Sequence, residues 1–461
     1  MLTADITASS TPTSLSDSAQ PHIVIVGANY GGLSVAKNLY ARFIAPSRKS
    51  GDDTEAKPEE PTQLIPPRVT LIDKRDGFLH LIGMCRAVVD VPFGDSIWLP
   101  HADCPWLQHP MFQREKGKVV SVHPHHLELE DGRSIDFDYL VIATGLTRAP
   151  PIWPQATDHD EYKAEIRRYL EEIKPADRAV VVGGGAVGVE IAAEIKEEFP
   201  EKHVTLVHSR ELPIVGPFIK EFRTRVVEEL EAAGVEVILG ERVVSEKIQD
   251  EASSADGTVE KTIDPSPKIT NKSATATAVE LTTSSGRVIH ADWVINCTGA
   301  GQPASDFLHS LPATTDEPLT TKDGLIRVKK NLQLIDPAYS HIFAIGDVND
   351  LHEVKLAGGS IYMGYFVAKN LLKLMQAAGH YNDIISDSAT ADEVEAGEDG
   401  LFTYPEYPPQ LVLLLGKKHG VAQYLGQVWE FDWVNTVTGG DTSFKKCADG
   451  LALFGYPDSL A

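Results

Sequence analysis

The stretch AVVVGGGAVGVEIAAEIKEEFPEKHVTLVH, residues 179–208, combines a short apolar run, three spaced glycines, an amphipathic segment and a second apolar run. Gly183, Gly185 and Gly188 complete the G-x-G-x-x-G pattern that follows the first strand of a dinucleotide-binding βαβ unit. The second apolar run begins about 15 residues after Gly188, as a compact unit requires. The stretch therefore predicts a strand, a pyrophosphate-binding turn, a helix and a second, parallel strand.

Another copy of this pattern lies near the start of the chain, in PHIVIVGANYGGLSVAKNL, residues 21–39. Gly27 and Gly32 occupy the outer glycine positions, whereas the middle position is Asn29. Asparagine is among the residues that best tolerate left-handed backbone geometry, so we expect the turn to be altered but kept. Two strand-turn-helix copies in one chain are difficult to explain by packing alone, and they favour two bound dinucleotides.

The acidic residue expected at the end of the second strand of the first copy is Asp73, in RVTLID. It lies about 40 residues beyond Gly32, whereas the usual spacing is about 20. The intervening APSRKSGDDTEAKPEEPTQ, from Ala45, concentrates proline and charge without periodicity and is interpreted as an inserted loop. Residues 250–278 and 387–400 have a similar character and are also expected to be loops.

Composition and charge limit the classes of function. The chain has 461 residues, of which 42% are hydrophobic, enough for two or three packed domains. Its formal net charge of -24 disfavours nucleic acid as a partner. The four cysteines are widely spaced without a C-x-x-C pair, which fits a reducing compartment and excludes a local disulfide relay. No apolar run is long enough to span a bilayer, so we expect a cytoplasmic protein.

Three further stretches complete a family pattern: DYLVIATG (138–145), ADWVINCTG (291–299) and SHIFAIGDV (340–348). With the two glycine turns, they make the sequence similar to the two-dinucleotide-binding-domain flavoprotein reductases. Within that superfamily it resembles the apoptosis-inducing-factor-like FAD/NAD(P)-dependent pyridine nucleotide oxidoreductases, and most closely the ferroptosis suppressor family. The stretches DKRDGFLHLIGMCRAVV, VKLAGG and PPQLVLLLGKKHGVAQ also carry this likeness.

The resemblance implies an α/β fold with two Rossmann-like dinucleotide-binding domains (the glutathione-reductase-like FAD/NAD(P) fold) and a small C-terminal α+β segment. The FAD-binding domain is expected to be discontinuous, over residues 21–150 and 292–385. An NAD(P)-binding domain over residues 151–291 is inserted into it, and residues 400–461 form the C-terminal domain. Residues 1–20, rich in Ser and Thr and without Lys or Arg, are expected to be a disordered tail.

The first βαβ unit resembles the FAD site of the family, with Asp73 on the adenosine ribose and Asp347 on the ribityl chain. Each assignment has a plainer alternative, because an Asp after a strand and a Thr-Gly pair are also common turn formers. The resemblance places the following residues at the FAD site: Gly27, Asn29, Tyr30, Gly31, Gly32, Asp73, Lys74, Arg75, Val119 at the adenine, Ala143, Thr144 and Gly145 on the isoalloxazine side, Gly346 and Asp347, with Gly299 at the second crossing between domains.

The second unit, with Gly183, Gly185 and Gly188, resembles the NAD(P)H site. Its second strand ends at His208, where an NAD-selective protein would carry Asp or Glu. His208 and Arg210 would attract a 2′-phosphate, so we expect NADPH to be accepted together with NADH. The alternative is that Arg210 is only a solvated surface charge.

Glu190 and Lys355 are the candidate catalytic residues. Glu190 falls in the first turn of the helix after Gly188, where the helix dipole favours a carboxylate regardless of function. Lys355, in EVKLAGG, matches a lysine that family members place near the flavin. An ion pair between the two would orient the site and stabilise negative charge on the reduced flavin.

The implied reaction is hydride transfer from the nicotinamide to the flavin, followed by electron transfer to a quinone or similar small acceptor. Two alternatives remain open: a flavin-dependent oxidase or tailoring oxidoreductase acting on a small metabolite, and a non-enzymatic redox-sensing protein. The chain starts Met-Leu rather than Met-Gly, so we expect no N-myristoyl anchor. A homodimer is compatible with the resemblance.

Two further groups of side chains are candidates for function. HPHH, residues 123–126, suggests a metal ion, but it sits in an expected turn with no cysteine or acidic partner at ligand spacing. We therefore expect these histidines to be structural and predict no metal site. His80 and Arg86 match a family stretch near the flavin, where they either line the pocket or only pack.

Overall fold

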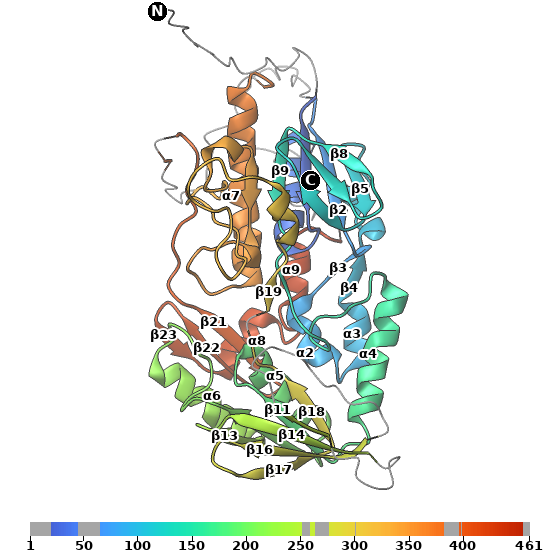
Figure 1. Cartoon of the computed structure of the whole chain (residues 1–461), viewed down its shortest axis with the longest axis vertical. Coiled ribbons are helices and arrows are strands. Elements are labelled where there is room, and N and C mark those ends of the chain that lie inside the picture. The colour runs from blue at the N-terminus through green and yellow to red at the C-terminus, as the bar shows by residue number, and fades with distance from the viewer. Residues whose placement is uncertain are drawn as a thin grey trace, which may run out of the picture.

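The computed structural model describes residues 20–44, 65–250, 259–262, 276–299, 301–381, 396–397 and 399–454. Residues 1–19 of the expected tail and most of the three expected loops lie outside the described residues. The described chain forms one parallel sheet in the upper half of Figure 1 and a second in the lower half, with a small C-terminal sheet beside the second.

All neighbouring strands of the first sheet are parallel, in the order β20 (Ile342–Ala344), β9 (Tyr139–Ile142), β1 (His22–Val26), β2 (Arg68–Asp73) and β5 (Phe112–Lys116). Central strand β1 is buried on both faces: Ile23 and Ile25 lie in one hydrophobic cluster, and Val24 and Val26 lie in another. Burial on both sides requires a continuous apolar run, which explains the sequence HIVIV. Helices α1 (Tyr30–Phe43) and α7 (Ala357–Ala377) pack together on the Ile23 side.

Shorter elements surround the first sheet. An antiparallel sheet contains β6 (Val119–Val122), β7 (His126–Leu129) and β8 (Ser134–Asp136). Strand β3 (Gly77–Leu79) pairs with β4 (Trp98–Pro100), and the chain between them forms α2 (Met84–Ala87) and α3 (Val91–Ser96). Short 3-10 helices of the described chain lie at Leu81–Gly83, His101–Asp103, Pro105–Gln108, Asp306–Ser310, Pro337–Tyr339 and Gly346–Val348.

The second parallel sheet is the one that the complete glycine pattern predicts. Its strand order is β13 (Glu236–Leu239), β12 (His203–His208), β11 (Arg178–Val182) and β18 (Trp293–Asn296). One face packs against α4 (His159–Ile173), α5 (Ala186–Glu198) and α6 (Lys220–Ala232). The other face is covered by an antiparallel sheet of β14 (Val243–Asp250), β15 (Val259–Thr262), β16 (Ala276–Thr283) and β17 (Val288–Ala291).

Strand β18 corrects the domain boundary predicted at residue 292. That boundary assigned residues 293–296 to the FAD-binding domain, whereas β18 pairs in parallel with β11 of the second sheet. The chain therefore leaves the second sheet only after β18. It returns toward the first sheet through β19 (Gln302–Pro303), which pairs antiparallel with β10 (Leu146–Thr147). Strand β10 lies on the outward crossing, the segment through which the chain passes from the first sheet to the second. The other boundaries stay predictions.

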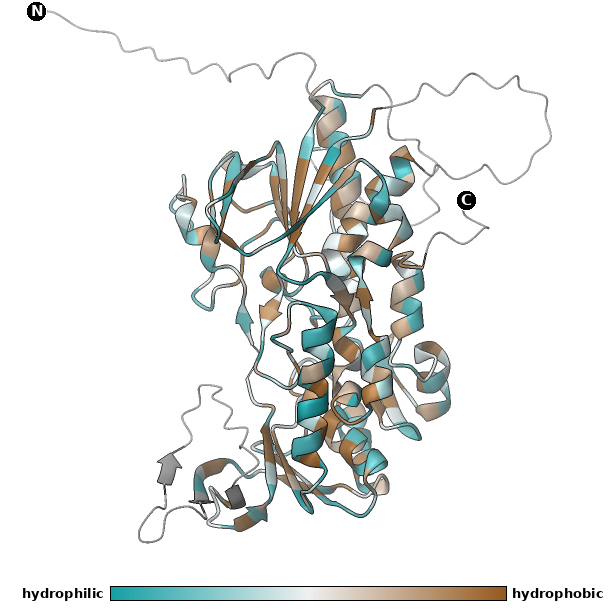
Figure 2. Ribbon diagram, turned by 90° about the vertical axis from the view of Figure 1, so that its right-hand side faces the viewer, coloured by the Kyte–Doolittle hydropathy of each residue, from teal (hydrophilic) through white to brown (hydrophobic). Residues whose placement is uncertain are grey.

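The C-terminal segment is a small α+β unit. Strands β21 (Leu411–Leu415), β22 (His419–Tyr424) and β23 (Gln427–Trp429) form an antiparallel sheet, followed by α8 (Phe431–Thr438) and α9 (Phe444–Gly450). Leu413, Leu415 and Val421 join the hydrophobic cluster of α5 and α6, whereas Cys447 and Ala448 of α9 join the cluster of β1, α1 and α7. The C-terminal unit therefore packs on both halves of the molecule. Figure 2 shows the apolar strands enclosed and the hydrophilic residues on the outer helix surfaces. The predicted α/β fold with two Rossmann-like units and a C-terminal α+β segment is confirmed.

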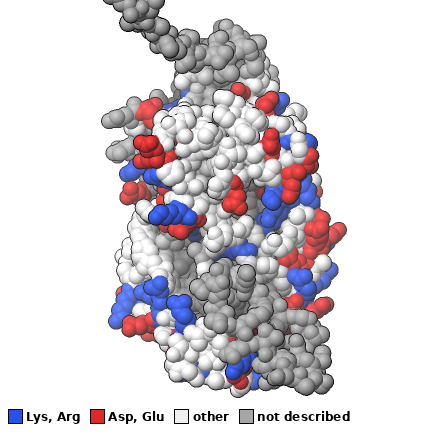
Figure 3. All heavy atoms as spheres, viewed as in Figure 1, with Lys and Arg blue, Asp and Glu red and all other residues white. Residues whose placement is uncertain are grey.

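Two surface features follow from the described residues. Among them, no helix combines the length and the apolar character needed to cross a lipid bilayer. On the face seen in Figure 3, Lys and Arg side chains lie interspersed with Asp and Glu side chains. This face therefore lacks, among its described residues, the continuous basic surface that a nucleic-acid backbone requires. The absence of a nucleic-acid partner remains a prediction.

A buried ion pair joins the parts of the fold. The Arg86 guanidinium in α2 donates to the Glu194 carboxylate in α5 at 3.0 Å, and both side chains are only 4% exposed. The same guanidinium donates to the carbonyl oxygens of Gly416 at 3.3 Å and Gly440 at 2.7 Å, in the C-terminal segment. Of the two roles left open for Arg86, these contacts support packing.

We expect Arg86→Met to lower the free energy of unfolding by about 3 kcal/mol or more, because the Glu194 carboxylate would lose its buried counter-charge. Urea unfolding measures this loss. The matched control is Lys445→Met, which removes a pair with Asp449 whose side chains are 74% and 49% exposed. That change should cost less than about 1 kcal/mol. Equal losses in the two variants would contradict a special role for Arg86.

Candidate dinucleotide-binding and redox site

The first glycine turn joins β1 to α1 with no room for side chains at its two ends. Gly27 has a φ of +103°, and a Cβ atom there would collide with the carbonyl oxygen of Ala143, after β9. A Cβ atom on Gly32 would collide with the carbonyl oxygen of Gly27. The outer glycines thus allow the close approach of strand, turn and helix that a dinucleotide-binding turn requires.

Asn29 keeps this turn by a different route from the expected one. Its φ and ψ are -117° and -151°, an extended conformation, so a tolerance of left-handed geometry is not what keeps the turn. The positive φ belongs to Gly27 instead. The Asn29 side-chain nitrogen donates to the carbonyl oxygen of Leu79 at 3.0 Å, while its Oδ1 atom is buried without a hydrogen-bond partner in the described chain. The free N–H groups at the start of α1 fit a pyrophosphate, and the orphaned oxygen fits a hydroxyl donor, so the residues suit FAD.

Asp73 closes the first unit from the end of β2. Its carboxylate accepts the backbone N–H of Ala28 at 2.7 Å and that of Arg75 at 2.8 Å. The Arg75 side chain, predicted beside FAD, donates instead to the carbonyl oxygen of Pro154 at 3.0 Å and lies over the Trp153 ring. Arg75 is therefore held by the segment that follows the outward crossing. Its role at FAD stays a prediction.

The remaining residues predicted for FAD come from several elements, and Gly299 lines the pocket beside α5 instead of the first turn. Tyr30 and Gly31 begin α1, and Val119 is buried at the start of β6. Thr144 donates its hydroxyl to the carbonyl oxygen of Ala304 at 2.7 Å, which ties together the two crossings between the sheets. Gly145, Gly299 and Gly346 have φ values of +67°, +91° and +74°, whereas Lys74 is half-buried and burial lowers its pKa.

Tyr30 links the first turn to the C-terminal segment. Its hydroxyl donates to Nδ1 of His80 at 3.1 Å, and Nε2 of His80 donates to the carbonyl oxygen of Thr442 at 2.9 Å. Burial lowers the pKa of His80 to about 4, so the ring is neutral and its tautomer is set by these two partners. The sequence alone did not reveal this chain of bonds, because Thr442 lies 362 residues beyond His80.

The second glycine turn repeats the geometry of the first. Gly183 has a φ of +115°, and a Cβ atom on Gly188 would collide with the carbonyl oxygen of Gly183. The backbone N–H of Gly184 donates to Nδ1 of His208 at 3.0 Å, at the position where Ala28 contacts Asp73 in the first unit. A Cβ atom on Gly185 would meet nothing within 4 Å. The middle of this turn therefore faces open space, which fits a bound pyrophosphate.

His208 corrects part of the predicted electrostatics. Burial lowers its pKa, and the nearby charges of Arg210 and Arg223 lower it further, so the ring is neutral at neutral pH. Because Nδ1 accepts the Gly184 N–H, the proton sits on Nε2, which is buried and unpartnered within the described chain. The neutral His208 ring supplies no positive charge to a 2′-phosphate. Arg210 is exposed two residues further on and remains the predicted cation.

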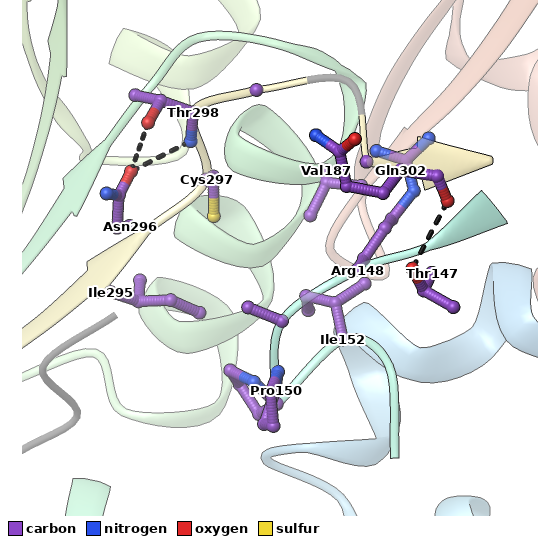
Figure 4. A pocket seen from close by; sticks show the side chains of 14 residues that line it. Thr147, Arg148, Pro150, Ile152, Val187, Ile295, Asn296, Cys297, Thr298 and Gln302 are labelled. Carbon is purple, nitrogen blue, oxygen red and sulfur yellow. Dashed lines mark hydrogen bonds between the residues drawn. The ribbon is translucent and has the colours of Figure 1, made fainter. Parts of the chain in front are cut away.

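A pocket of about 280 Å³ opens between the two crossings and α5 (Figure 4). Val187 borders it from α5, and Cys297 points toward the same space from the end of β18. Asn296 Oδ1 accepts the backbone N–H of Thr298 at 2.9 Å and its hydroxyl at 2.6 Å, which holds this wall in place. Of the lining residues, only Gly299 was identified from the sequence, because the wall combines segments about 150 residues apart.

Asp347 and Lys355 form one charged group near the end of β20. Burial raises the pKa of the Asp347 carboxyl, while the charges of Lys355 and Arg148 oppose this rise. The Lys355 ammonium donates to the carbonyl oxygen and Oδ1 of Asn349, both at 3.0 Å, and to the carbonyl oxygen of Leu351 at 3.1 Å. In the described chain no donor is bonded to the Asp347 carboxyl. It therefore fits the hydroxyl groups of a ribityl chain.

Glu190 points away from Lys355. Its carboxyl lies 3.9 Å from Cys85 Sγ and is hydrogen-bonded by the backbone of Leu414 in β21. Burial, and then the charge of Glu194, raise the pKa of Glu190 to about 8. Among the described residues no ion pair joins Glu190 to Lys355, so the predicted pair is not formed. The reason is that α5 turns this face toward α2 and the C-terminal sheet. The catalytic role of each residue stays a prediction.

The histidines of HPHH have an acidic neighbour. One ligand atom from each of His123, His126 and Glu128 lies within 4.8 Å of the others. The sequence-based statement that no acidic partner stands at ligand spacing is therefore wrong. Strand pairing between β6 and β7 is the cause, because it brings Glu128 opposite Ser121 and beside the histidines.

The chain belongs to the pyridine nucleotide-disulphide oxidoreductase family, whose sequence profile matches residues 106–380. This family depends on FAD and NAD(P)H, and the chain is accordingly an NAD(P)H-dependent oxidoreductase. The two glycine turns are the structural counterpart of those two cofactors.

Relatives support the resemblance found in the sequence. Oxidoreductase OXR1 of Ajellomyces capsulatus is 34% identical over 363 residues, covering 76% of this chain and 73% of that protein. Apoptosis-inducing factor homolog B of Dictyostelium discoideum is 28% identical, covering 88% and 90%, and ferroptosis suppressor protein 1 of Homo sapiens is 27% identical, covering 74% and 77%. The predicted likeness to these proteins is confirmed.

A solved structure shows the same fold. The sulfide:quinone oxidoreductase of Aquifex aeolicus superposes with a TM-score of 0.59 at 16% identity, covering 94% of this chain and 92% of that one. At this identity the likeness establishes the architecture alone.

Glu190→Gln should change how stability depends on pH. The native carboxyl has a pKa of about 8 and keeps its proton up to that pH, whereas the unfolded side chain loses it near the ordinary glutamate pKa of 4.5. The stability that this proton supplies is thus full below that lower value and is lost as pH rises toward 8. From about pH 5 to about pH 7.5, the wild type should lose about 3 kcal/mol relative to Glu190→Gln.

Urea unfolding of the two proteins across this pH range measures the difference. The matched control is Glu231→Gln, which neutralises an exposed carboxylate on α6 and should leave the pH dependence unchanged. Parallel stability curves for wild type and Glu190→Gln would show that Glu190 does not retain its proton.

Proposed function

We propose that this protein passes a hydride from NAD(P)H to FAD and then passes electrons to a quinone-like small acceptor. The observation that carries the proposal is one contact made twice. In each turn, the residue after the first glycine donates its backbone N–H to the side chain at the end of the next strand. Ala28 donates to Asp73 in the first unit, and Gly184 donates to His208 in the second. Repetition of this contact in two parallel sheets supports two dinucleotide sites in one chain.

In this proposal the first turn and Asp347 hold FAD, which supplies the redox chemistry that side chains lack. The open start of α1 receives the pyrophosphate, and the unpaired Asp347 carboxyl accepts hydroxyl donors. Lys355 places a positive charge beside Asp347, which partly offsets the cost of burying that carboxylate. Glu190 and Cys85, which contact each other between α2 and α5, add no charge beside the flavin.

The pocket beside α5 is proposed for the nicotinamide end of NAD(P)H. Val187 lies two residues beyond Gly185, so a nucleotide on the second turn would extend toward it. Ile152 and Ile295 offer apolar surface to a planar ring, and Arg148 and Asn296 offer polar groups at its edge. A mostly apolar pocket with a few polar groups is the usual form of such a site.

The acceptor is proposed to be a small molecule rather than a disulfide. The cysteines of the described chain are free, and burial raises the pKa of Cys297 to about 12. A protonated thiol is a poor nucleophile, so Cys297 does not fit thiol–disulfide exchange. The resemblance to ferroptosis suppressor proteins favours a quinone. A cytoplasmic location and a homodimer remain predictions.

An anaerobic experiment tests the proposal. The visible spectrum of the flavin-loaded full-length protein is recorded, NADPH or NADH is added, and a soluble quinone follows. We expect the nucleotide to bleach the flavin within seconds and the quinone to restore it. In a separate aerated sample without NAD(P)H, peroxide formed from O2 as a small metabolite is oxidised would favour the oxidase alternative. In the anaerobic sample, a reduced complex that no acceptor reoxidises would favour redox sensing. A flavin that neither nucleotide bleaches would contradict the proposal.

We propose that NADPH is used together with NADH, with Arg210 as the cation for the 2′-phosphate. Arg210→Ala should raise the KM for NADPH about tenfold, the loss expected for one charge-assisted hydrogen bond, and leave the KM for NADH within about twofold. The matched control is Arg225→Ala, an arginine of α6 paired with Glu430. Steady-state kinetics with both nucleotides measure the effect, and equal changes for NADPH and NADH would contradict it.

A further inference from the structure

The hairpin formed by β6 and β7 carries histidines that the proposed reaction does not use. His123, His126 and Glu128 each present one ligand atom, and all three atoms lie within 4.8 Å of one another. We infer that this hairpin binds a borderline divalent metal ion of the Zn²⁺ class, with these three side chains as ligands.

The backbone places the three side chains on one face. Val122 pairs with Leu127, and both are fully buried in the hydrophobic core. Side chains alternate along a strand, so the neighbouring pairs of the hairpin point to the opposite face, toward solvent. The ligand residues belong to these outward pairs: Ser121 opposite Glu128, and His123 opposite His126.

The turn itself is held closed. The backbone N–H of His123 donates to the carbonyl oxygen of His126 at 2.8 Å, across Pro124 and His125. The carbonyl oxygen of Pro124 accepts a hydrogen bond from Nε2 of His341 at 2.6 Å. The two ligand histidines are therefore neighbours before any ion binds, which lowers the entropy cost of forming the site.

The ligand atoms are available. The His123 and His126 rings are nearly parallel, with centroids 4.3 Å apart, and within the described chain no group hydrogen-bonds the His126 ring. His123 Nε2 has only a long contact of 3.5 Å with Ser121 Oγ. Ser121 Oγ also donates to Glu128 Oε2 at 2.9 Å, which orients the carboxylate as an outer-shell partner does in metal sites.

The donor set selects the class of ion. Two imidazoles and one carboxylate match Zn²⁺, Ni²⁺ or Cu²⁺, whereas Mg²⁺ and Ca²⁺ prefer sets made of oxygen alone. Bonds of about 2.1 Å place ligand atoms about 3 to 3.5 Å apart, so small side-chain rotations suffice from the present spacing. Three protein ligands leave a position open to water, and the net charge of -24 attracts cations to the molecule.

Calorimetric titration of the full-length, flavin-loaded protein without a histidine tag tests the inference. Zn²⁺ is the ligand, Mg²⁺ is the negative control, and Co²⁺ serves as the spectroscopic probe. We expect one Zn²⁺ ion per chain and a binding constant about tenfold or more weaker in His126→Asn, which removes a ligand. His125→Asn is the matched control, because His125 stacks on His341 and is not a ligand.

Two further measurements keep the inference falsifiable. Glu128→Gln, at an exposed position, should also weaken Zn²⁺ binding and should alter the Co²⁺ absorption bands, even if His126→Asn folds poorly. Zn²⁺ bound by the cysteine thiols instead would persist in both variants and would overturn the inference. Failure of the wild type to bind Zn²⁺, or equal loss of binding in His125→Asn and His126→Asn, would overturn it as well.

Discussion

The arrangement of α2, α5 and the C-terminal segment depends on the ion pair and hydrogen bonds of the buried Arg86 guanidinium. A charge taken out of water must be surrounded by partners, and Arg86 finds them on α5 and on two C-terminal loops. These partners, Glu194, Gly416 and Gly440, lie far from Arg86 in the sequence. Helix α2, helix α5 and the C-terminal segment are therefore held together at this point.

The two dinucleotide turns share one backbone geometry but differ in the side chain that ends the next strand. In both, close approach excludes side chains at the outer glycines, and an N–H of the turn is accepted by the residue ending the next strand. That residue is an anion in the first unit and a neutral imidazole in the second. Asp73 can accept ribose hydroxyls, whereas Nε2 of His208 can only donate. The same fold thus presents opposite hydrogen-bonding groups at its two sites.

Burial decides the charge state of the interior side chains. Burial raises the pKa of both Glu190 and Cys85, so neither carries a charge at neutral pH. Lys355 is half-buried but lies among carbonyl oxygens and beside Asp347, which keep its ammonium satisfied. Glu190 and Lys355 therefore do not form an ion pair. Glu190 avoids the cost of desolvating a charge by keeping its proton, and Lys355 offsets that cost with hydrogen bonds to carbonyl oxygens.

The sequence by itself determined the two βαβ units, because positive φ at Gly27 and Gly183 and the apolar runs before them are local requirements that local residues meet. It also indicated Asp73, Asp347 and the family. Only the tertiary structure decided that Asn29 is extended, that Glu190 faces Cys85, and that β18 joins the second sheet. It likewise brought Glu128 to the histidines of the hairpin. These features depend on burial and on contacts between remote segments, so they could not be predicted from the spacing of residues along the chain.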